Sequence, residues 1–391
     1  MIIKFKRKKF LTALKRVVQL VPKQVLGMDQ YDTATIKLED DNNIRFEYSD
    51  SNVIVRFNIN AEEIVKSDDD FKEFGLDATK LHNIVSVIQD DFVLLDFNFN
   101  ASIVKVSGTD IDKNAIFNVV LKPGYFEHKD AVDVDKIIGL KDTRIDIDEV
   151  KFVNAILNMN ECPLIQSKNM SENISFYKDE NGSTCSYTST GSVVFFHNYN
   201  ESFTFDESIS ISRRNMCYIA SLCDGNVISI RKEPGKPNGY FIIKDTAIGD
   251  GYDIYVASRA FIGFKVQSVK NIIAEKPVKF KINRDDFINI IQRVAIVDPI
   301  GCHLTVNGDK FYVFVNDRPG NTYSQEIKIE PISESIDNCM IQLDYKLLNL
   351  ITKRFKPDKY IIEINGNQNK SEFLITSEDR EQVSVIAGYR S

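Results

Sequence analysis

The feature that most constrains this chain is a short pattern that recurs six times along its 391 residues. In each copy, an apolar residue of a strand-like segment is followed five positions later by a large apolar residue of a helix-like segment. Successive strand residues are 71, 71, 64, 71 and 61 positions apart. A nearly constant period predicts one supersecondary unit that is used repeatedly. The six pairs are Phe5/Phe10, Leu76/Leu81, Ile147/Phe152, Ile211/Met216, Ile282/Phe287 and Leu343/Leu348.

Each copy is predicted to fold as a strand, a helix and three further strands. In the first copy, alternating segments at 35–39, 44–48 and 53–59 follow the helix and are separated by turns rich in Asp, Asn and Ser. One short helix on one small sheet buries little apolar surface. Two copies are therefore expected to share an antiparallel sheet, with their helices on one face of it.

Pairing the six copies predicts an α+β fold of three similar domains. The expected domains are residues 1–125, 143–268 and 276–391, with linkers at 122–142 and at about 268–277. Repeated units of this kind favour a curved or closed assembly with helices inside and sheets outside.

Composition narrows the function and the location. The net charge of −7 argues against a protein whose whole surface coats nucleic acid, although a local basic stripe is compatible with it. No apolar run reaches 18 residues and no secretory signal is evident, so no membrane partner is expected. The six cysteines and four histidines lack metal-ligand spacing. These observations predict a cytoplasmic protein with reduced cysteines and without cofactor or metal.

The size of a closed ring can be estimated from helix packing. Helices pack about 9 Å apart and are about 10 Å thick, so six in a circle would leave a hole of about 7 Å. Twelve would leave about 24 Å, and a DNA duplex is roughly 20 Å wide. The estimate predicts a head-to-tail homodimer that encircles duplex DNA.

The distribution of basic residues agrees with that prediction. The first helix carries Arg7, Lys8, Lys9, Lys15 and Arg16 and no acid. Lys and Arg contact phosphates without reading base sequence, so these residues are candidate DNA contacts. Ordinary solvated helix faces are the alternative interpretation. The further candidates are Lys23, Arg213, Arg214, Lys353 and Arg354.

Four segments resemble a known family, the bacterial DNA polymerase III beta subunit or sliding clamp. Phe5–Val17 resembles its first strand and helix, Phe280–Val297 the start of its third domain, and Tyr345–Leu350 with Val385–Ser391 its last unit and tail. The resemblance covers the whole chain. It implies a non-enzymatic processivity factor for DNA replication in a bacterial or infected-host cytoplasm. The implied partners are duplex DNA, a DNA polymerase and an ATP-driven clamp loader.

The resemblance also implies a hydrophobic pocket for short partner peptides between the second and third domains. Residues 189–194 read Ser-Thr-Gly-Ser-Val-Val where the family has Thr-Asp-Gly-His-Arg-Leu, so apolar character is kept and polar groups are lost. An altered partner preference is expected; the alternative is that Val193 and Val194 are simply strand core. The pocket residues implied are Gly191, Val193, Val194, Val385, Ile386, Ala387, Gly388, Tyr389 and Arg390.

Two other classes of protein remain open. A structural α+β assembly protein would show the same repeat but would need no basic helices. A metal-dependent DNA-processing enzyme could use the acidic clusters Asp68–Asp70 and Asp90–Asp91 to bind Mg²⁺. No phosphate-binding loop, nucleophile elbow or zinc-protease motif occurs in the sequence, which favours a protein that is not an enzyme.

Overall fold

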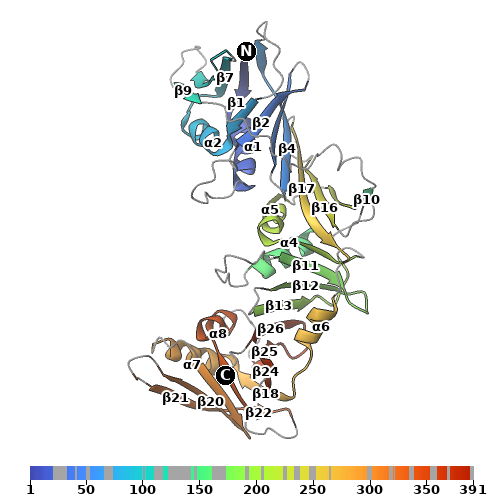
Figure 1. Ribbon diagram of the computed structural model, residues 1–391, viewed down its shortest axis with the longest axis vertical. Helices are drawn as coiled ribbons and strands as arrows, with labels where there is room; N and C mark the ends of the chain where they lie inside the picture. Colours follow the sequence, from blue (N-terminus) through green and yellow to red (C-terminus); the bar gives the residue numbers. More distant parts are fainter. Residues whose placement is uncertain are drawn as a thin grey trace. The chain divides into compact units, whose positions relative to one another are not determined.

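The computed structural model (Figure 1) contains two compact units, which are described separately. Unit 1 is Met1–Ile145 with Arg214–Phe261, and unit 2 is Asp146–Arg213 with Ile262–Ser391. The structure describes residues 1–20, 33–39, 42–49, 53–65, 74–98, 100–101, 103–109, 118–121, 142–144, 148–160, 173–189, 193–203, 207–222, 227–232, 238–245, 252–263, 266–296, 302–316, 320, 322–333, 339–352, 359–367 and 370–387.

The described residues contain the predicted repeat of a strand, a helix and three strands. The first three copies are β1 (Ile2–Lys6), α1 (Arg7–Leu20), β2 (Thr33–Leu38), β3 (Asn43–Ser49), β4 (Val53–Asn60); β6 (Phe74–Asp77), α2 (Ala78–Val87), β7 (Phe92–Asn98), β8 (Ile103–Thr109), β9 (Asn118–Leu121); and β10 (Asp142–Arg144), α4 (Glu149–Asn160), β11 (Asn173–Lys178), β12 (Thr184–Ser189), β13 (Val193–Asn198). The prediction of a repeated unit is therefore confirmed here.

The remaining three copies follow the same order. They are β14 (Ile209–Ser212), α5 (Arg213–Leu222), β15 (Val227–Lys232), β16 (Asn238–Asp245), β17 (Tyr252–Ile262); β18 (Val278–Asn283), α7 (Arg284–Ile296), β19 (Cys302–Asn307), β20 (Lys310–Asn316), β21 (Thr322–Lys328); and β23 (Cys339–Leu343), α8 (Tyr345–Thr352), β24 (Lys359–Asn367), β25 (Lys370–Thr376), β26 (Gln382–Ala387). Three elements lie outside the repeat: β5 (Glu63–Val65), β22 (Glu330–Pro331) and α6 (Gln267–Ile273).

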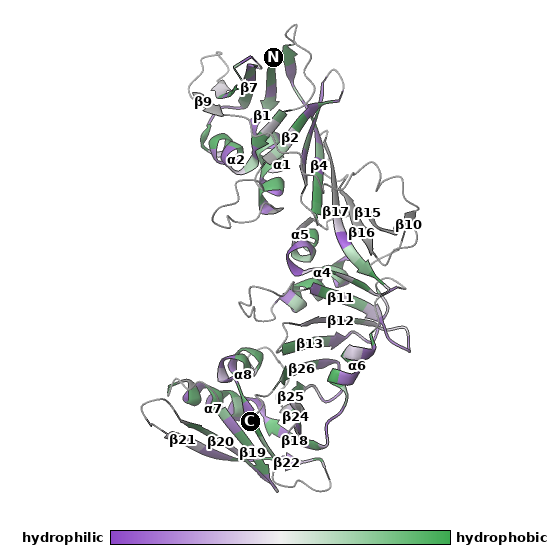
Figure 2. Ribbon diagram, in the orientation of Figure 1, coloured by the Kyte–Doolittle hydropathy of each residue, from purple (hydrophilic) through white to green (hydrophobic). Residues whose placement is uncertain are grey.

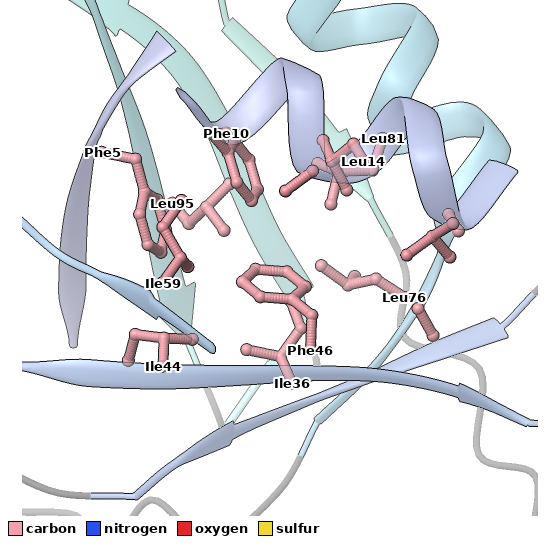
Figure 3. Close-up of a cluster of buried hydrophobic side chains, with 14 of the residues drawn as sticks. Phe5, Phe10, Leu14, Ile36, Ile44, Phe46, Ile59, Leu76, Leu81 and Leu95 are labelled. Carbon is pink, nitrogen blue, oxygen red and sulfur yellow. The ribbon is translucent and has the colours of Figure 1, made fainter. Parts of the chain in front are cut away.

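The apolar pairs that revealed the repeat form its core. Every described member is at most 2% exposed, and Ile147 lies outside the described residues. In the first copy, the rings of Phe5 and Phe10 stack 4.6 Å apart. Figure 3 shows both rings in one cluster with Phe46 and with aliphatic side chains from the strands.

Polar side chains at the strand ends start several of the helices. Asp77 accepts the backbone N–H of Lys80 at 2.8 Å, and Asp344 accepts that of Lys346 at 2.8 Å. Asn283 accepts two N–H groups of the first turn of α7, at 2.9 and 3.1 Å. Such caps satisfy N–H groups that have no partner within the helix, so strand and helix follow each other directly.

Unit 1 contains two antiparallel sheets. The first has the order β5-β1-β7-β8-β9. The second runs β6-β2-β3-β4-β17-β16-β15-β10, and the register of β17 on β4 runs from Tyr252↔Ile59 to Ser258↔Val53. Side chains from α1, α2 and both sheets share one core cluster.

Unit 2 also contains two antiparallel sheets. The larger runs β14-β11-β12-β13-β26-β25-β24-β18-β22. The smaller has the order β21-β20-β19-β23. Figure 2 shows that α7 and α8 carry both hydrophobic and hydrophilic residues, as expected for helices with one face on a sheet.

Neighbouring copies exchange strands in the same way three times. The first strand of each copy pairs with the second strand of the other. The pairings are β1·β7 with β6·β2, β10·β15 with β14·β11, and β18·β24 with β23·β19.

Two predicted linkers have different outcomes. The segment predicted as a linker at about 268–277 contains α6, so that prediction is wrong for its first half. Residues 122–141 lie outside the described residues. None of the helices in the described part of the chain is long and apolar enough to cross a membrane.

Candidate nucleic-acid interface and partner surface

The first helix presents a cationic face to water. Its apolar stripe, Phe10, Ala13, Leu14 and Val17, is at most 1% exposed. Lys8 and Lys15 lie on the other side of the helix and are exposed. They are two turns apart, or about 10 Å along the axis. Since α1 contains five cations and no acid, this face can contact phosphates without internal neutralisation.

Arg7 has a different environment, at the end of a neighbouring helix. Its Nε donates to the carbonyl of Val85 at 3.3 Å and its terminal nitrogen to the carbonyl of Ser86 at 3.1 Å. Both carbonyls lie at the C-terminal end of α2, where helix carbonyls lack intrahelical partners and the helix dipole is negative. Arg7 therefore connects the start of α1 to the end of α2.

The same arrangement occurs twice more. Arg213, the first residue of α5, is 6% exposed and donates to the Asn160 side-chain oxygen at 2.9 Å and to the Asn160 carbonyl. Arg284, the first residue of α7, hydrogen-bonds the Tyr360 hydroxyl, which donates to the Thr352 carbonyl at 2.5 Å. Burial raises the pKa of Tyr360, and the bond to Arg284 opposes that rise. In all three cases, an arginine or its tyrosine partner satisfies a carbonyl at the end of another helix.

We expect Arg213→Gln to lower the free energy of unfolding by about 1–3 kcal/mol, because the Asn160 carbonyl loses a charged donor. The adjacent Arg214 is exposed, so Arg214→Gln should change stability by only about 0.5 kcal/mol. Urea unfolding of the two variants makes the comparison. Equal losses would contradict the assignment of Arg213 to the helix end.

The remaining predicted DNA contacts are distributed as follows. Lys9 and Arg16 are half-buried, and the Arg16 carbonyl accepts the Tyr218 hydroxyl at 2.9 Å. Lys23, Lys353 and Arg354 lie outside the described residues. On two other helices the lysines pair with acids: Lys80 with Asp77 at 2.9 Å, and Lys151 with Glu201 at 2.5 Å. Cationic excess is thus greatest on α1.

The two predicted walls of the peptide pocket lie side by side in unit 2. Strands β13 and β26 are antiparallel neighbours, with Val193 opposite Ile386 and Val194 opposite Val385. Because side chains alternate along a strand, Val194, Val385 and Ala387 share one face, whereas Val193 and Ile386 share the other. The latter two are 1% and 0% exposed, so the structure does not bring them to the candidate surface. Gly191, Gly388, Tyr389 and Arg390 lie outside the described residues.

Helix α6 packs on the face that carries Val194 and Val385. We call the resulting group the α6 cluster. Burial raises the pKa of one member, the Cys185 thiol, to about 12. The buried members are Tyr177, Cys185, Phe196, Val269, Leu374, Val383 and Val385, and the partly buried ones are Tyr187, Val194, Val266, Ile272 and Ile273.

Similarity to solved structures covers the complete chain. A DNA polymerase sliding clamp from Caulobacter crescentus matches with a TM-score of 0.75 and 14% identity over 100% of both chains. The DNA polymerase III subunit beta from Pseudomonas aeruginosa matches at 0.71 and 13% over 100% of both. The beta subunit from Thermotoga maritima matches at 0.72 and 11% over 100% of this chain and 99% of that chain.

The chain has the sliding-clamp fold. The predicted fold class and the predicted resemblance are confirmed at the level of structure. By sequence, no protein-family profile and no curated protein matches.

Within the clamp fold, the sequence interpretation missed α6. Val266, Val269 and Ile273 have helical spacing, but the helix has only seven residues and ends shortly before Pro277. Its stability depends on apolar contacts with β26 and its neighbours, which local sequence does not reveal. That spacing is the one signal that could have indicated α6.

The clamp fold offers no evident metal site in its described part. No group of three or more His, Cys, Asp or Glu residues there could hold a metal ion. Asp90 lies against the β8 backbone, so that a Cβ at Gly108 would come within 1.9 Å of its carboxylate. Asp68–Asp70 lie outside the described residues.

Proposed function

We propose that this protein is a DNA sliding clamp. Two copies close into a ring around duplex DNA and tether a DNA polymerase, without catalysing a reaction. The observation that carries the proposal is full-length similarity to sliding clamps, combined with a basic α1 face on an acidic chain. An ATP-driven loader and a cytoplasmic location belong to the same proposal.

The three reciprocal strand exchanges support a division into three domains. Each exchange ties two copies together through two strand pairs, so neither copy completes its sheets alone. We therefore keep the proposed domains at 1–125, 143–268 and 276–391.

Two strand pairs within the chain suggest how two copies would join. β4 pairs with β17, and β13 pairs with β26. Each of these strands is the fourth strand of its copy, and each pair combines an odd-numbered with an even-numbered copy. The fourth strands left over are β9 and β21. Among the described residues, β9 pairs with β8 alone and β21 with β20 alone.

Pairing of β9 with β21 of a second chain would repeat the internal joins, and two such pairs would close a ring of two chains. Unpaired strand edges are templates for pairing with another chain. The ring would contain twelve repeat helices, the number for which packing leaves a hole of about 24 Å. A homodimer thus satisfies both the strand edges and the width of duplex DNA.

In the proposed ring, Lys8, Lys9, Lys15, Arg16 and Arg214 contact phosphates. Arg7 and Arg213 serve the helix ends instead. The proposed partner surface is the exposed side of the α6 cluster with Val194, Val385 and Ala387. Apolar anchors would supply most of the binding free energy of a partner peptide.

Trapping on circular DNA tests the proposal without a loader. The dimer is dissociated by dilution and re-formed at micromolar concentration in the presence of a nicked circular plasmid. Gel filtration in high salt then removes protein held by phosphate contacts. We expect the protein to remain on the circle and to leave after a restriction enzyme linearises it. Equal retention on circular and linear DNA would contradict encirclement.

A further inference from the structure

A buried ionic cluster fastens the C-terminal end of α6 to the last strands of the chain. Arg380 lies in the turn between β25 and β26. One of its terminal nitrogens donates to the carbonyl of Ile273, the last residue of α6, at 2.5 Å. Its other terminal nitrogen pairs with Glu363 on β24. One guanidinium therefore holds the helix end and a sheet carboxylate together.

The Glu363 carboxylate depends on these contacts, because its side chain is 2% exposed. Its second oxygen accepts the backbone N–H of Lys276 at 2.9 Å. The Lys276 ammonium in turn pairs with Glu372 at 2.5 Å. A buried carboxylate is tolerated when it is both paired and hydrogen-bonded, and removing one partner is strongly destabilising. The segment after α6 is thereby fixed on β24 and β25.

The other attachment of α6 is weaker. Lys270 pairs with Glu180 at 2.6 Å, but the Glu180 side chain is 87% exposed. Exposed ion pairs contribute little to stability. The apolar contacts of α6 and the Arg380 cluster are therefore the main forces that hold the helix on the sheet.

We propose that Arg380 is a positioning residue for the partner surface: it holds α6 on the β13·β26 pair, so that the α6 cluster keeps the shape a partner peptide requires. The inference rests on the proposed function of that surface. Arg380 itself is not part of the α6 cluster. It acts through the Ile273 carbonyl and Glu363.

Two native thiols report the effect within one molecule. Cys185 is a buried member of the α6 cluster, whereas Cys302 on β19 is 0% exposed and belongs to the smaller sheet of unit 2. Burial raises the pKa of both thiols to about 12. Release of α6 should expose Cys185 alone, and global unfolding should expose both.

The test variant is Arg380→Lys. Lysine keeps the charge beside Glu363, but its compact ammonium cannot reproduce the guanidinium fork that reaches two acceptors. We expect iodoacetamide to label Cys185 about tenfold faster than in the wild type, because local opening exposes the thiol, and Cys302 at an unchanged rate. Peptide mass spectrometry gives both rates. Equal acceleration of both, or no change at Cys185, would overturn the inference.

A second measurement addresses binding. The probe is a fluorescent peptide selected from a random dodecapeptide library on the wild type and retained because Val194→Asp abolishes its binding. We expect Arg380→Lys to raise its Kd about tenfold. The control Lys281→Ala, which breaks the nearby pair of Lys281 with Glu378, should leave it unchanged.

The outcomes separate the two proposals. If no selected peptide depends on Val194, the proposed partner surface fails, while the thiol rates still decide whether Arg380 holds α6. If Val194 matters and Arg380→Lys binds like the wild type, the positioning role of Arg380 is wrong.

Discussion

The triple variant Lys8→Glu, Lys15→Glu, Arg16→Glu should lose at least about a hundredfold in affinity for duplex DNA at low salt. Each neutralised phosphate releases counterions, so the slope of log K against log salt should fall by about 2.7 for three lost contacts per chain. Fluorescence anisotropy with a linear duplex measures both quantities. The fold should persist, because the apolar stripe of α1 is untouched.

A matched control has the same change in net charge but lies on strands. Lys37 on β2, Lys105 on β8 and Lys328 on β21 are exposed. Reversal of these three lysines should reduce affinity much less than reversal on α1. A loss as large as that of the α1 variant would show that only net charge matters and would refute α1 as the DNA-contacting face.

The second large effect concerns the edge of β21. Ile329 N–H donates to the Asp309 carbonyl at 2.9 Å, which marks a hydrogen-bonded pair of the β20·β21 ladder. Such pairs alternate along antiparallel strands, so the N–H of Ser324 points away from β20. Ser324→Pro removes that donor while leaving the bonds to β20 in place. A ring has two such joins, so we expect the dimer dissociation constant to rise about a hundredfold or more.

Sedimentation velocity over a range of concentrations measures this effect. Ser324→Ala is the control, because it retains the backbone donor and removes only an exposed hydroxyl. A wild type that is monomeric throughout, or a Ser324→Pro variant that dimerises like the wild type, would contradict pairing at this edge.

Much of the fold could be predicted because the same physical requirement recurs in every copy. Phe5 and Phe10 are buried for the same reason as Leu343 and Leu348: a strand and its following helix must cover one core. Helix α6 has no counterpart in the repeat and is stabilised by contacts distant in sequence, so it was read as a linker.

The site was less predictable than the fold. Composition identifies a basic helix, but it cannot tell whether a guanidinium faces solvent or the end of another helix, as Arg7 and Arg213 do. Likewise, the adjacent Val193 and Val194 point to opposite faces, and only the pairing with β26 shows which one meets α6. Arg380 carried no sequence signal, because its partners Glu363 and Ile273 are 17 and 107 positions away.

Two-dimensional class averages of the purified protein by electron microscopy test the central claim most directly. A clamp predicts closed rings with a roughly six-fold outline and a hole of about 24 Å, wide enough for duplex DNA. Solid particles or open filaments would contradict ring closure and would favour a structural assembly protein built from the same repeat.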